Sequence, residues 1–169
     1  MPVKVEIKMS IERMADFMVY HIFTSGAGMM AIVLAAVNMG FSVALAIKGR
    51  YGYTALFVLV AVIIIAGFPK LIRMKVRKRL QNSKRLTEPI TYEFDEQGIK
   101  TTIQDDSGKA SWSKFKRAVS HNNLIILYDP EKRAIILPIE QIGEQYDAVV
   151  EMIRTHMPAQ SVRIRTPEK

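Results

Sequence analysis

The chain of 169 residues contains no cysteine. This absence excludes a disulfide framework, a thiolate nucleophile and a cysteine-ligated zinc site, so any folded domain must be held together by its core. The three histidines are scattered at positions 21, 121 and 156 and lack the spacing of metal ligands. No phosphate-binding glycine loop is present either. We therefore expect neither a metal nor a cofactor.

Groups suited to catalysis are also scarce. Asp95, Glu96, Asp105 and Asp106 all occupy positions where turns are expected, which explains them without a catalytic role. The single tryptophan, Trp112, is expected to be a core aromatic residue. An active site gathers acids, bases or nucleophiles in one pocket, and the sequence shows no such grouping. The protein is therefore predicted not to be an enzyme.

Two long segments lack charge altogether, over residues 26–47 and 51–68. A transmembrane helix needs about 20 apolar residues, and buried helices of a soluble core would have a polar face. A signal peptide is disfavoured because 25 mixed residues precede the first segment. Since only Lys48-Gly49-Arg50 separates the two, residues 26–69 are predicted to form an antiparallel transmembrane hairpin.

The net charge of +8 resides in one place. Residues 70–85 contain eight basic residues and no acid, and the other 16 Lys and Arg balance the 16 Asp and Glu. Because Lys and Arg favour the cytoplasmic side of a span, both termini are predicted to be cytoplasmic. Leu71, Ile72, Val76 and Leu80 fall on one helical stripe, so this connector (70–87) either only sets topology or also binds anionic headgroups. Its basic residues are Lys70, Arg73, Lys75, Arg77, Lys78, Arg79, Lys84 and Arg85.

One polar residue, Asn38, interrupts the first span near its middle. An unpaired amide is costly there, so we expect it to form a hydrogen bond across a helix contact or to the backbone. Ala36, Gly40 and Ala44 form a small-x-x-x-small series that permits close approach of another helix. These four residues are candidate helix–helix contacts, and a homo-oligomer through the first span is one outcome.

Residues 88–158 follow a different pattern. Apolar and polar residues alternate from Ile90 to Phe94, and about six short strands separated by turn signals predict an antiparallel sheet that curls into a small barrel or sandwich. The turn Asp105-Asp106-Ser107-Gly108 is the clearest hairpin signal. Apolar residues then recur at helical spacing from Ile142 to Met157, which predicts a capping helix, with residues 159–169 left as a tail.

The N-terminal segment, residues 1–25, predicts a strand and a helix. Val3, Val5 and Ile7 alternate with charged residues, and Ser10 is a plausible N-cap for an amphipathic helix. Both elements are expected on the same side of the membrane as the β domain. We therefore predict that they pack against it.

The order of several short motifs resembles a known family. Two spans and a basic connector precede the segments Tyr92–Ile99, Trp112–Phe115, Leu124–Tyr128 and Ile135–Pro138, and this arrangement is similar to the YcxB-like family of small bacterial membrane proteins. The resemblance implies a pleckstrin-homology-like (PH-like) domain, a strongly bent antiparallel sheet with a C-terminal helix, at the bacterial inner membrane. The family tends to place a basic residue after the proline, but here Ile139-Glu140 follows, which puts an anion-binding role of that corner in doubt.

Together these features predict an α+β membrane protein, with a two-helix hairpin and a small PH-like domain. The favoured function is a non-catalytic binding or scaffold module that recruits a protein, peptide or lipid headgroup at the cytoplasmic face. The alternative, a small channel or transporter subunit or accessory protein, would need ionisable groups within the spans, but the charges between 26 and 68 are Lys48 and Arg50 in the loop. Nucleic acid is disfavoured because the basic segment adjoins the bilayer.

Overall fold

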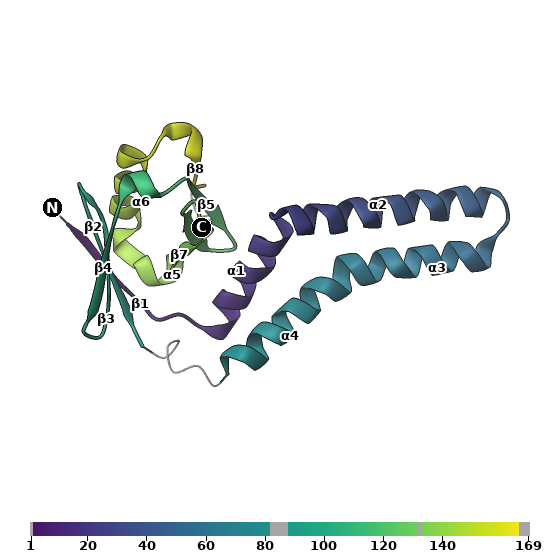
Figure 1. Ribbon diagram of the computed structural model, residues 1–169, viewed down its shortest axis with the longest axis horizontal. Helices are drawn as coiled ribbons and strands as arrows, with labels where there is room; N and C mark the ends of the chain where they lie inside the picture. The colour runs from purple at the N-terminus through teal and green to yellow at the C-terminus, as the bar shows by residue number, and fades with distance from the viewer. Residues whose placement is uncertain (1, 82–87, 132, 166–169) are drawn as a thin grey trace. The chain divides into compact units, whose positions relative to one another are not determined.

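A computed structural model describes residues 2–81, 88–131 and 133–165. The chain folds as two compact units. One is helical and comprises Met14–Gln81, and the other is an α+β unit formed by the residues up to Arg13 together with those that follow the helical unit. Figure 1 labels helices and strands of both units. The predicted α+β class is therefore confirmed.

The helical unit is built around two long antiparallel helices joined by a short turn. Gly49 adopts φ +69° in this turn, a conformation that favours glycine. Ser25 caps the first long helix, because its hydroxyl accepts a hydrogen bond from the N–H of Gly28. Both long helices are apolar and long enough to cross a membrane. The elements are α1 (Ile11–Phe23), α2 (Gly26–Ile47), α3 (Tyr51–Val62), the π-helical turn η1 (Ile63–Gly67) and α4 (Phe68–Leu80).

The second long helix continues past Pro69 into the basic segment, where the sequence suggested an end to the span. A proline lacks the backbone N–H and its ring clashes with the carbonyl four residues earlier, which normally kinks a helix. Here the turn before it widens, and the N–H of Phe68 bonds to the carbonyl of Ile63, five residues back. The helix therefore accommodates Pro69 with a π-helical turn, and α4 carries the basic residues up to Arg79.

The α+β unit contains two four-stranded sheets, ordered β1-β2-β3-β4 and β7-β6-β5-β8. Among the described residues no strand pairing joins them, so of the predicted barrel or sandwich the closed barrel is wrong. The physical reason is the 3₁₀ turn η3 (Trp112–Lys114), which takes the chain out of the first sheet before the second begins. The strands are β1 (Val3–Ile7), β2 (Ile90–Asp95), β3 (Gly98–Ile103), β4 (Asp106–Ser111), β5 (Arg117–His121), β6 (Leu124–Tyr128), β7 (Ala134–Pro138) and β8 (Val162–Arg163).

The predicted N-terminal strand is confirmed and joins the first sheet as β1. It runs antiparallel to β2, with Val5 opposite Tyr92 and Ile7 opposite Ile90. The hydroxyl of Ser10 accepts a hydrogen bond from the N–H of Arg13 at 3.2 Å, as expected of an N-cap. The domain thus includes residues that precede the hairpin in sequence.

Two predicted turns have different outcomes. The β3–β4 turn is formed by Gln104 and Asp105, two residues earlier than the sequence suggested, with Gln104 at φ +52°. The chain can turn there because Ile103 pairs directly with Asp106 and keeps the strands in register. The sequence also predicts a turn at His121-Asn122-Asn123. This turn is confirmed over Asn122 and Asn123, which both have positive φ, a conformation that asparagine tolerates in two-residue hairpins.

The predicted C-terminal tail is in fact packed up to residue 165. Strand β8 pairs in parallel with β5, and the buried Ile164 follows it. The N–H of Arg165 donates to the hydroxyl of Ser120 at 2.8 Å. This short strand is non-local and too brief to show a periodic pattern, which explains why the sequence did not reveal it.

The core of this unit lies around β6 and the C-terminal helix. All four residues from Leu124 to Leu127 are fully buried, which is typical of a central strand. Trp112 is buried too, as predicted, and its indole N–H donates to the carbonyl of Asp95 at 2.8 Å. The ring of His156 stacks on it at 5.2 Å between centroids. The helical elements here are α5 (Ile139–Ile142), the 3₁₀ turn η4 (Gly143–Gln145), α6 (Tyr146–His156) and the 3₁₀ turn η5 (Ala159–Ser161).

Candidate functional site

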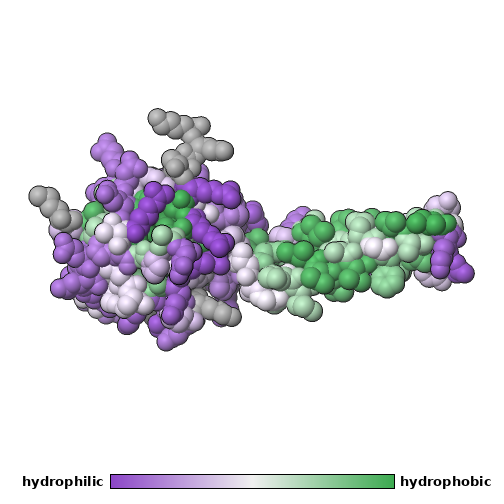
Figure 2. Space-filling model, turned by 90° about the horizontal axis from the view of Figure 1, so that it is seen from above, coloured by the Kyte–Doolittle hydropathy of each residue, from purple (hydrophilic) through white to green (hydrophobic). Residues whose placement is uncertain are grey.

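The largest exposed apolar surface of the described chain covers the hairpin formed by α2, α3 and η1. Most large apolar side chains on these helices are more than a third exposed, with Tyr51 at 72% and Ile47 at 81%. Figure 2 shows this surface as a nearly continuous band of hydrophobic residues with hydrophilic residues at the turn. The helices of a soluble core would be mostly buried. In the two long helices of this chain, only 17% and 11% of the most apolar stretch is buried. A surface of this kind is typical of sites that contact a membrane or another protein.

The seam between α2 and α3 is lined with small and polar residues. Ala35, Asn38 and Ser42 on α2 are buried at spacings of three and four residues, and α3 contributes Ala61. The amide of Asn38 donates to the carbonyl of Leu34 at 2.8 Å. The hydroxyl of Ser42 likewise donates to the carbonyl of Met39. The sequence predicted that Asn38 forms a hydrogen bond either across a helix contact or to the backbone, and the structure contains the hydrogen bond to the backbone.

The four predicted helix-contact residues do not form one face. Asn38 lies in the seam within the hairpin, whereas Ala36, Gly40 and Ala44 are exposed on its outside. The two sets differ because residues two apart on a helix point in nearly opposite directions. Self-association through Ala36, Gly40 and Ala44 stays a prediction.

The predicted basic segment is divided between two faces of α4. Ile72 is buried and Val76 is half-buried, so this part of the predicted apolar stripe packs within the chain. The guanidinium of Arg73 forms an ion pair with Asp16 of α1 at 2.9 Å. Leu71 is instead exposed. Lys70, Lys75, Arg77, Lys78 and Arg79 are exposed along α4, and Lys84 and Arg85 lie outside the described residues.

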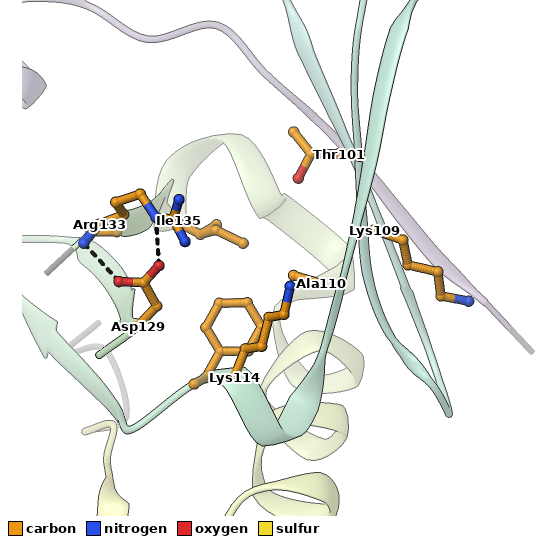
Figure 3. Close-up of a pocket in the computed structure, with 10 residues that line it drawn as sticks. Thr101, Lys109, Ala110, Lys114, Asp129, Arg133 and Ile135 are labelled. Carbon is orange, nitrogen blue, oxygen red and sulfur yellow. Dashed lines mark hydrogen bonds and ion pairs between the residues drawn. The ribbon is translucent and has the colours of Figure 1, made fainter. Parts of the chain in front are cut away.

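The α+β unit contains a groove of about 400 Å³ between β4 of one sheet and the β6–β7 hairpin of the other. Figure 3 shows Thr101 and Ala110 on the sheet side, with Ile135 across from them. Phe115 completes the apolar lining. The groove exists because Gly108 and Ala110 are too small to fill the space above the inner face of β3 and β4.

Charged side chains stand at the rim of this groove. Arg133 donates from Nε to Asp129 at 2.7 Å, and this pair closes the β6–β7 turn. Lys114 lies at the opposite rim and has no acidic partner among the described residues, whereas Lys109 points away to the outer face of the sheet (Figure 3). Strand β4 is also an edge strand, so half of its backbone groups are available to an added strand.

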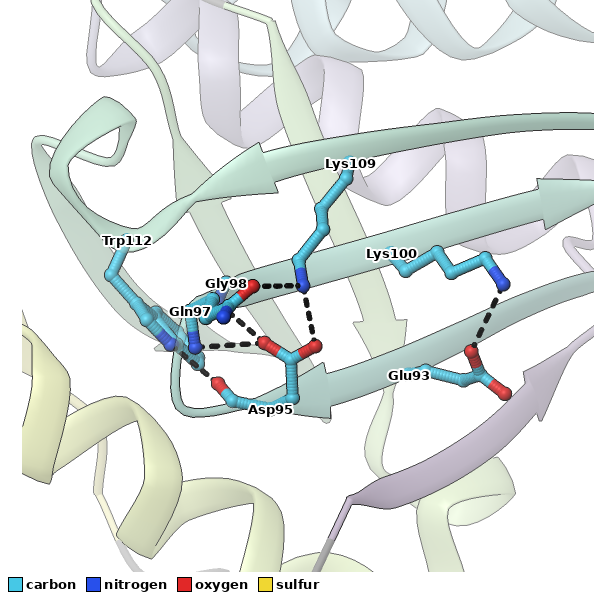
Figure 4. Close-up of polar contacts among 7 residues, drawn as sticks. All are labelled: Glu93, Asp95, Gln97, Gly98, Lys100, Lys109 and Trp112. Carbon is cyan, nitrogen blue, oxygen red and sulfur yellow. Dashed lines mark hydrogen bonds and ion pairs between the residues drawn. The ribbon is translucent and has the colours of Figure 1, made fainter.

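The outer face of the first sheet carries a polar cluster that is internally satisfied (Figure 4). Asp95 accepts hydrogen bonds from the backbone N–H groups of Gln97 and Gly98, both at 2.8 Å, and from the ammonium group of Lys109 at 2.7 Å. The bond from Lys109 holds the pKa of Asp95 below its usual value, and the two backbone bonds act in the same direction. Glu93 pairs with Lys100 at 3.6 Å. These contacts explain the cluster as part of the β2–β3 turn.

The corner after Pro138 is occupied by an ion pair. Glu140 accepts a hydrogen bond from Nε of Arg13 at 3.1 Å, and a second bond joins the same two side chains. Next to it, Gln141 exchanges two hydrogen bonds with the backbone of Lys8, at 2.7 and 2.9 Å. Glu140, which stands where the resemblance led us to expect a basic residue, therefore links the N-terminal segment to α5 through its ion pair with Arg13.

Neither the groove nor the division of α4 into two faces was anticipated from the sequence. The one usable signal for the groove was the pair of small residues, Gly108 and Ala110, at alternate positions of β4. Within the described ranges, no three His, Asp or Glu residues are grouped so that they could hold a metal ion. The predicted candidates thus give an apolar surface and a basic helix, and the tertiary structure adds a groove.

Comparison with known proteins gives one match. No curated protein and no solved structure matches the chain. Residues 94–153, which run from the end of β2 through most of α6, match the model of the YcxB-like protein family. The resemblance of this chain to YcxB-like proteins is thereby confirmed over that segment.

Proposed function

We propose that the protein is a membrane-anchored, non-catalytic binding module, with the hairpin inserted in a bacterial plasma membrane and the α+β unit at its cytoplasmic face. The exposed apolar surface of the hairpin carries this proposal. At a rise of about 1.5 Å per residue, α2 is about 33 Å long, close to the hydrocarbon core of about 30 Å. Tyr51 and Tyr53 follow the turn, where aromatic residues suit an interface.

A second observation supports placing both flanks of the hairpin on one side. Strand β1 precedes the hairpin in sequence and β2 follows it, yet the two strands pair over five residues. Paired strands cannot be separated by a bilayer. The excess of Lys and Arg outside the turn then favours the cytoplasmic side for both termini.

The α+β unit is proposed to be PH-like and to present the groove next to β4 to its partner. The resemblance implies a strongly bent antiparallel sheet with a C-terminal helix, and the mostly antiparallel strands followed by α6 support this proposal. A groove with an apolar floor, a cationic Lys114 at its rim and an adjacent edge strand suits an extended peptide that carries an apolar residue and a carboxylate. The chemistry of binding is thus backbone pairing plus one buried side chain.

Cysteine labelling tests the anchoring directly, because the wild-type chain has no cysteine and gives no background. Lys48→Cys places a thiol in the turn, and Glu151→Cys places one on the exposed face of α6. In intact cells a membrane-impermeant maleimide should label the first variant, and it should label the second only after permeabilisation. Labelling of Glu151→Cys in intact cells would overturn the orientation, and extraction of the protein by alkaline carbonate would overturn the insertion.

A further inference from the structure

The uncovered side of α4 combines apolar and basic residues in one helical face. Leu71, Met74, Lys75 and Lys78 follow the spacing i, i+3, i+4, i+7, which places them together; we name these four residues the outer face of α4. Leu71 is 52% exposed and Met74 is 58% exposed. Lys75 and Lys78 have no acidic partner among the residues that the structure describes. Within the described part of the chain, no acidic side chain therefore neutralises this face and no segment covers it.

The opposite side of α4 is already occupied. Ile72 is buried, and Arg73 is held by Asp16 of α1 at 2.9 Å. The rings of Phe23 and Phe68 form an edge-to-face contact with 6.0 Å between their centroids, and this contact holds the start of α4 beside the end of α1. Because these contacts fix the rotation of α4, the outer face is the side that remains available to a partner.

The position of α4 along the chain determines what that partner is. The helix begins at Phe68, where the uncharged segment ends, so Leu71 lies about 4.5 Å beyond the apolar part and Lys78 about 15 Å beyond it. The headgroup layer is only about 5–8 Å thick on each side of the hydrocarbon core. A straight helix along the membrane normal would carry Lys78 past this layer. Figure 1 shows, however, that α4 departs from the line of α3, and η1 lies between these two helices, so α4 is inclined to α3.

We infer that the outer face of α4 lies on the bilayer surface and binds anionic lipid headgroups, with Leu71 and Met74 inserted among the acyl chains and Lys75 and Lys78 paired with phosphates. This inference rests on the proposed membrane anchoring and adds the lipid class and the residues. An amphipathic helix with apolar residues flanked by lysines has the chemistry for this contact. The π-helical turn at Ile63–Gly67 is what allows a spanning helix and a surface helix to be continuous.

The test uses the full chain with Met74→Cys, labelled with the polarity-sensitive fluorophore NBD and reconstituted in liposomes. One set of liposomes is phosphatidylcholine alone, and the other contains increasing phosphatidylglycerol. We expect the NBD emission to shift to the blue as phosphatidylglycerol rises, and the shift to weaken with salt, because charges are screened within about 8 Å at physiological ionic strength. Each lysine near an anionic surface contributes about 1 kcal/mol to lipid binding, so its removal should lower the affinity for the anionic lipid about fivefold.

Two double variants in the Met74→Cys background separate the outer face from charge in general. Lys75→Gln/Lys78→Gln should abolish the dependence on phosphatidylglycerol. Lys48→Gln/Arg50→Gln removes the same charge from the exposed turn at the other end of the hairpin and should retain the dependence. The inference would be overturned if both double variants lost the dependence on phosphatidylglycerol equally. It would also be overturned if the NBD emission shift were as large in phosphatidylcholine alone as in liposomes with phosphatidylglycerol. Carbonate extraction of each variant reports insertion separately, so a failure of the anchoring is distinguishable from a failure of the lipid contact.

Discussion

Substitution of Ile7 in β1 tests whether the segment before the hairpin is an integral part of the α+β unit. Ile7 is 0% exposed and lies opposite Ile90 of β2. Its neighbour Glu6 is on the same strand but points to solvent, so Glu6→Ala is a matched control. If β1 were only loosely attached, the two substitutions would have similar effects.

The expected loss of stability follows from the burial of Ile7. Replacing isoleucine by alanine removes three carbon groups, each worth about 0.8 kcal/mol when buried, or about 2.4 kcal/mol in all. The cavity left behind raises this, because large-to-small core substitutions of this kind cost about 2–5 kcal/mol. We therefore expect Ile7→Ala to lower the free energy of unfolding by about 3 kcal/mol. The exposed control should remain within about 0.5 kcal/mol of the wild type.

Urea titration of the detergent-solubilised full chain measures this difference. Trp112 is the only tryptophan and is buried in the α+β unit, so its emission reports the unfolding of that unit. With a slope of about 1–3 kcal/mol per molar urea, Ile7→Ala should lower the midpoint by about 1–3 M. A midpoint for Ile7→Ala that coincides with that of Glu6→Ala would refute the pairing of β1 with β2.

Three other predictions concern the same unit. Gly98→Ala should destabilise it by about 1–3 kcal/mol, because a Cβ there would lie 2.1 Å from the carbonyl oxygen of Ala110, whereas Gly108→Ala meets nothing within 4 Å and should be nearly neutral in the same urea assay. Ala110→Leu should be tolerated because it extends into the groove, whereas Ala118→Leu at a fully buried site should cost about 1–3 kcal/mol; equal losses would show that the groove is not open space. Burial raises the pKa of Tyr92 from 10.0 to about 12. The stability that its neutral form contributes is therefore present below pH 10 and is lost as the pH rises through the folded-state pKa. The urea midpoint of the wild type should fall over this alkaline range, and that of Tyr92→Phe should fall less.

Much of the local structure was predictable because apolar residues repeat at the short spacings that are typical of strands and helices. The alternation around Val5 and the helical spacing before Met157 correctly identified β1 and α6, since both patterns depend only on neighbouring residues. The sequence did not reveal that one helix continues through Pro69, because the π-helical turn that accommodates this proline depends on the surrounding helix. Strand β8 was missed because its pairing with β5 joins residues more than forty positions apart.

The candidate sites divide in the same way. The apolar hairpin and the basic segment are properties of composition, so the sequence was sufficient to find them. The groove beside β4 depends on how two sheets are spaced, and the pairing of Glu140 with Arg13 joins residues that are distant in sequence. Which side of α4 faces outward depends on the contacts of Ile72 and Arg73 with their neighbours.

The sequence by itself determined that the chain has two long uncharged helices, one basic segment and a β-rich C-terminal part, because hydropathy, charge and short periodicity are local quantities. Only the tertiary structure decided that the strands form two separate sheets, that β1 joins the first of them across the intervening hairpin, and that Leu71 rather than Ile72 is exposed on α4. These outcomes depend on which distant surfaces bury one another, and that choice is made by the packing of the whole fold.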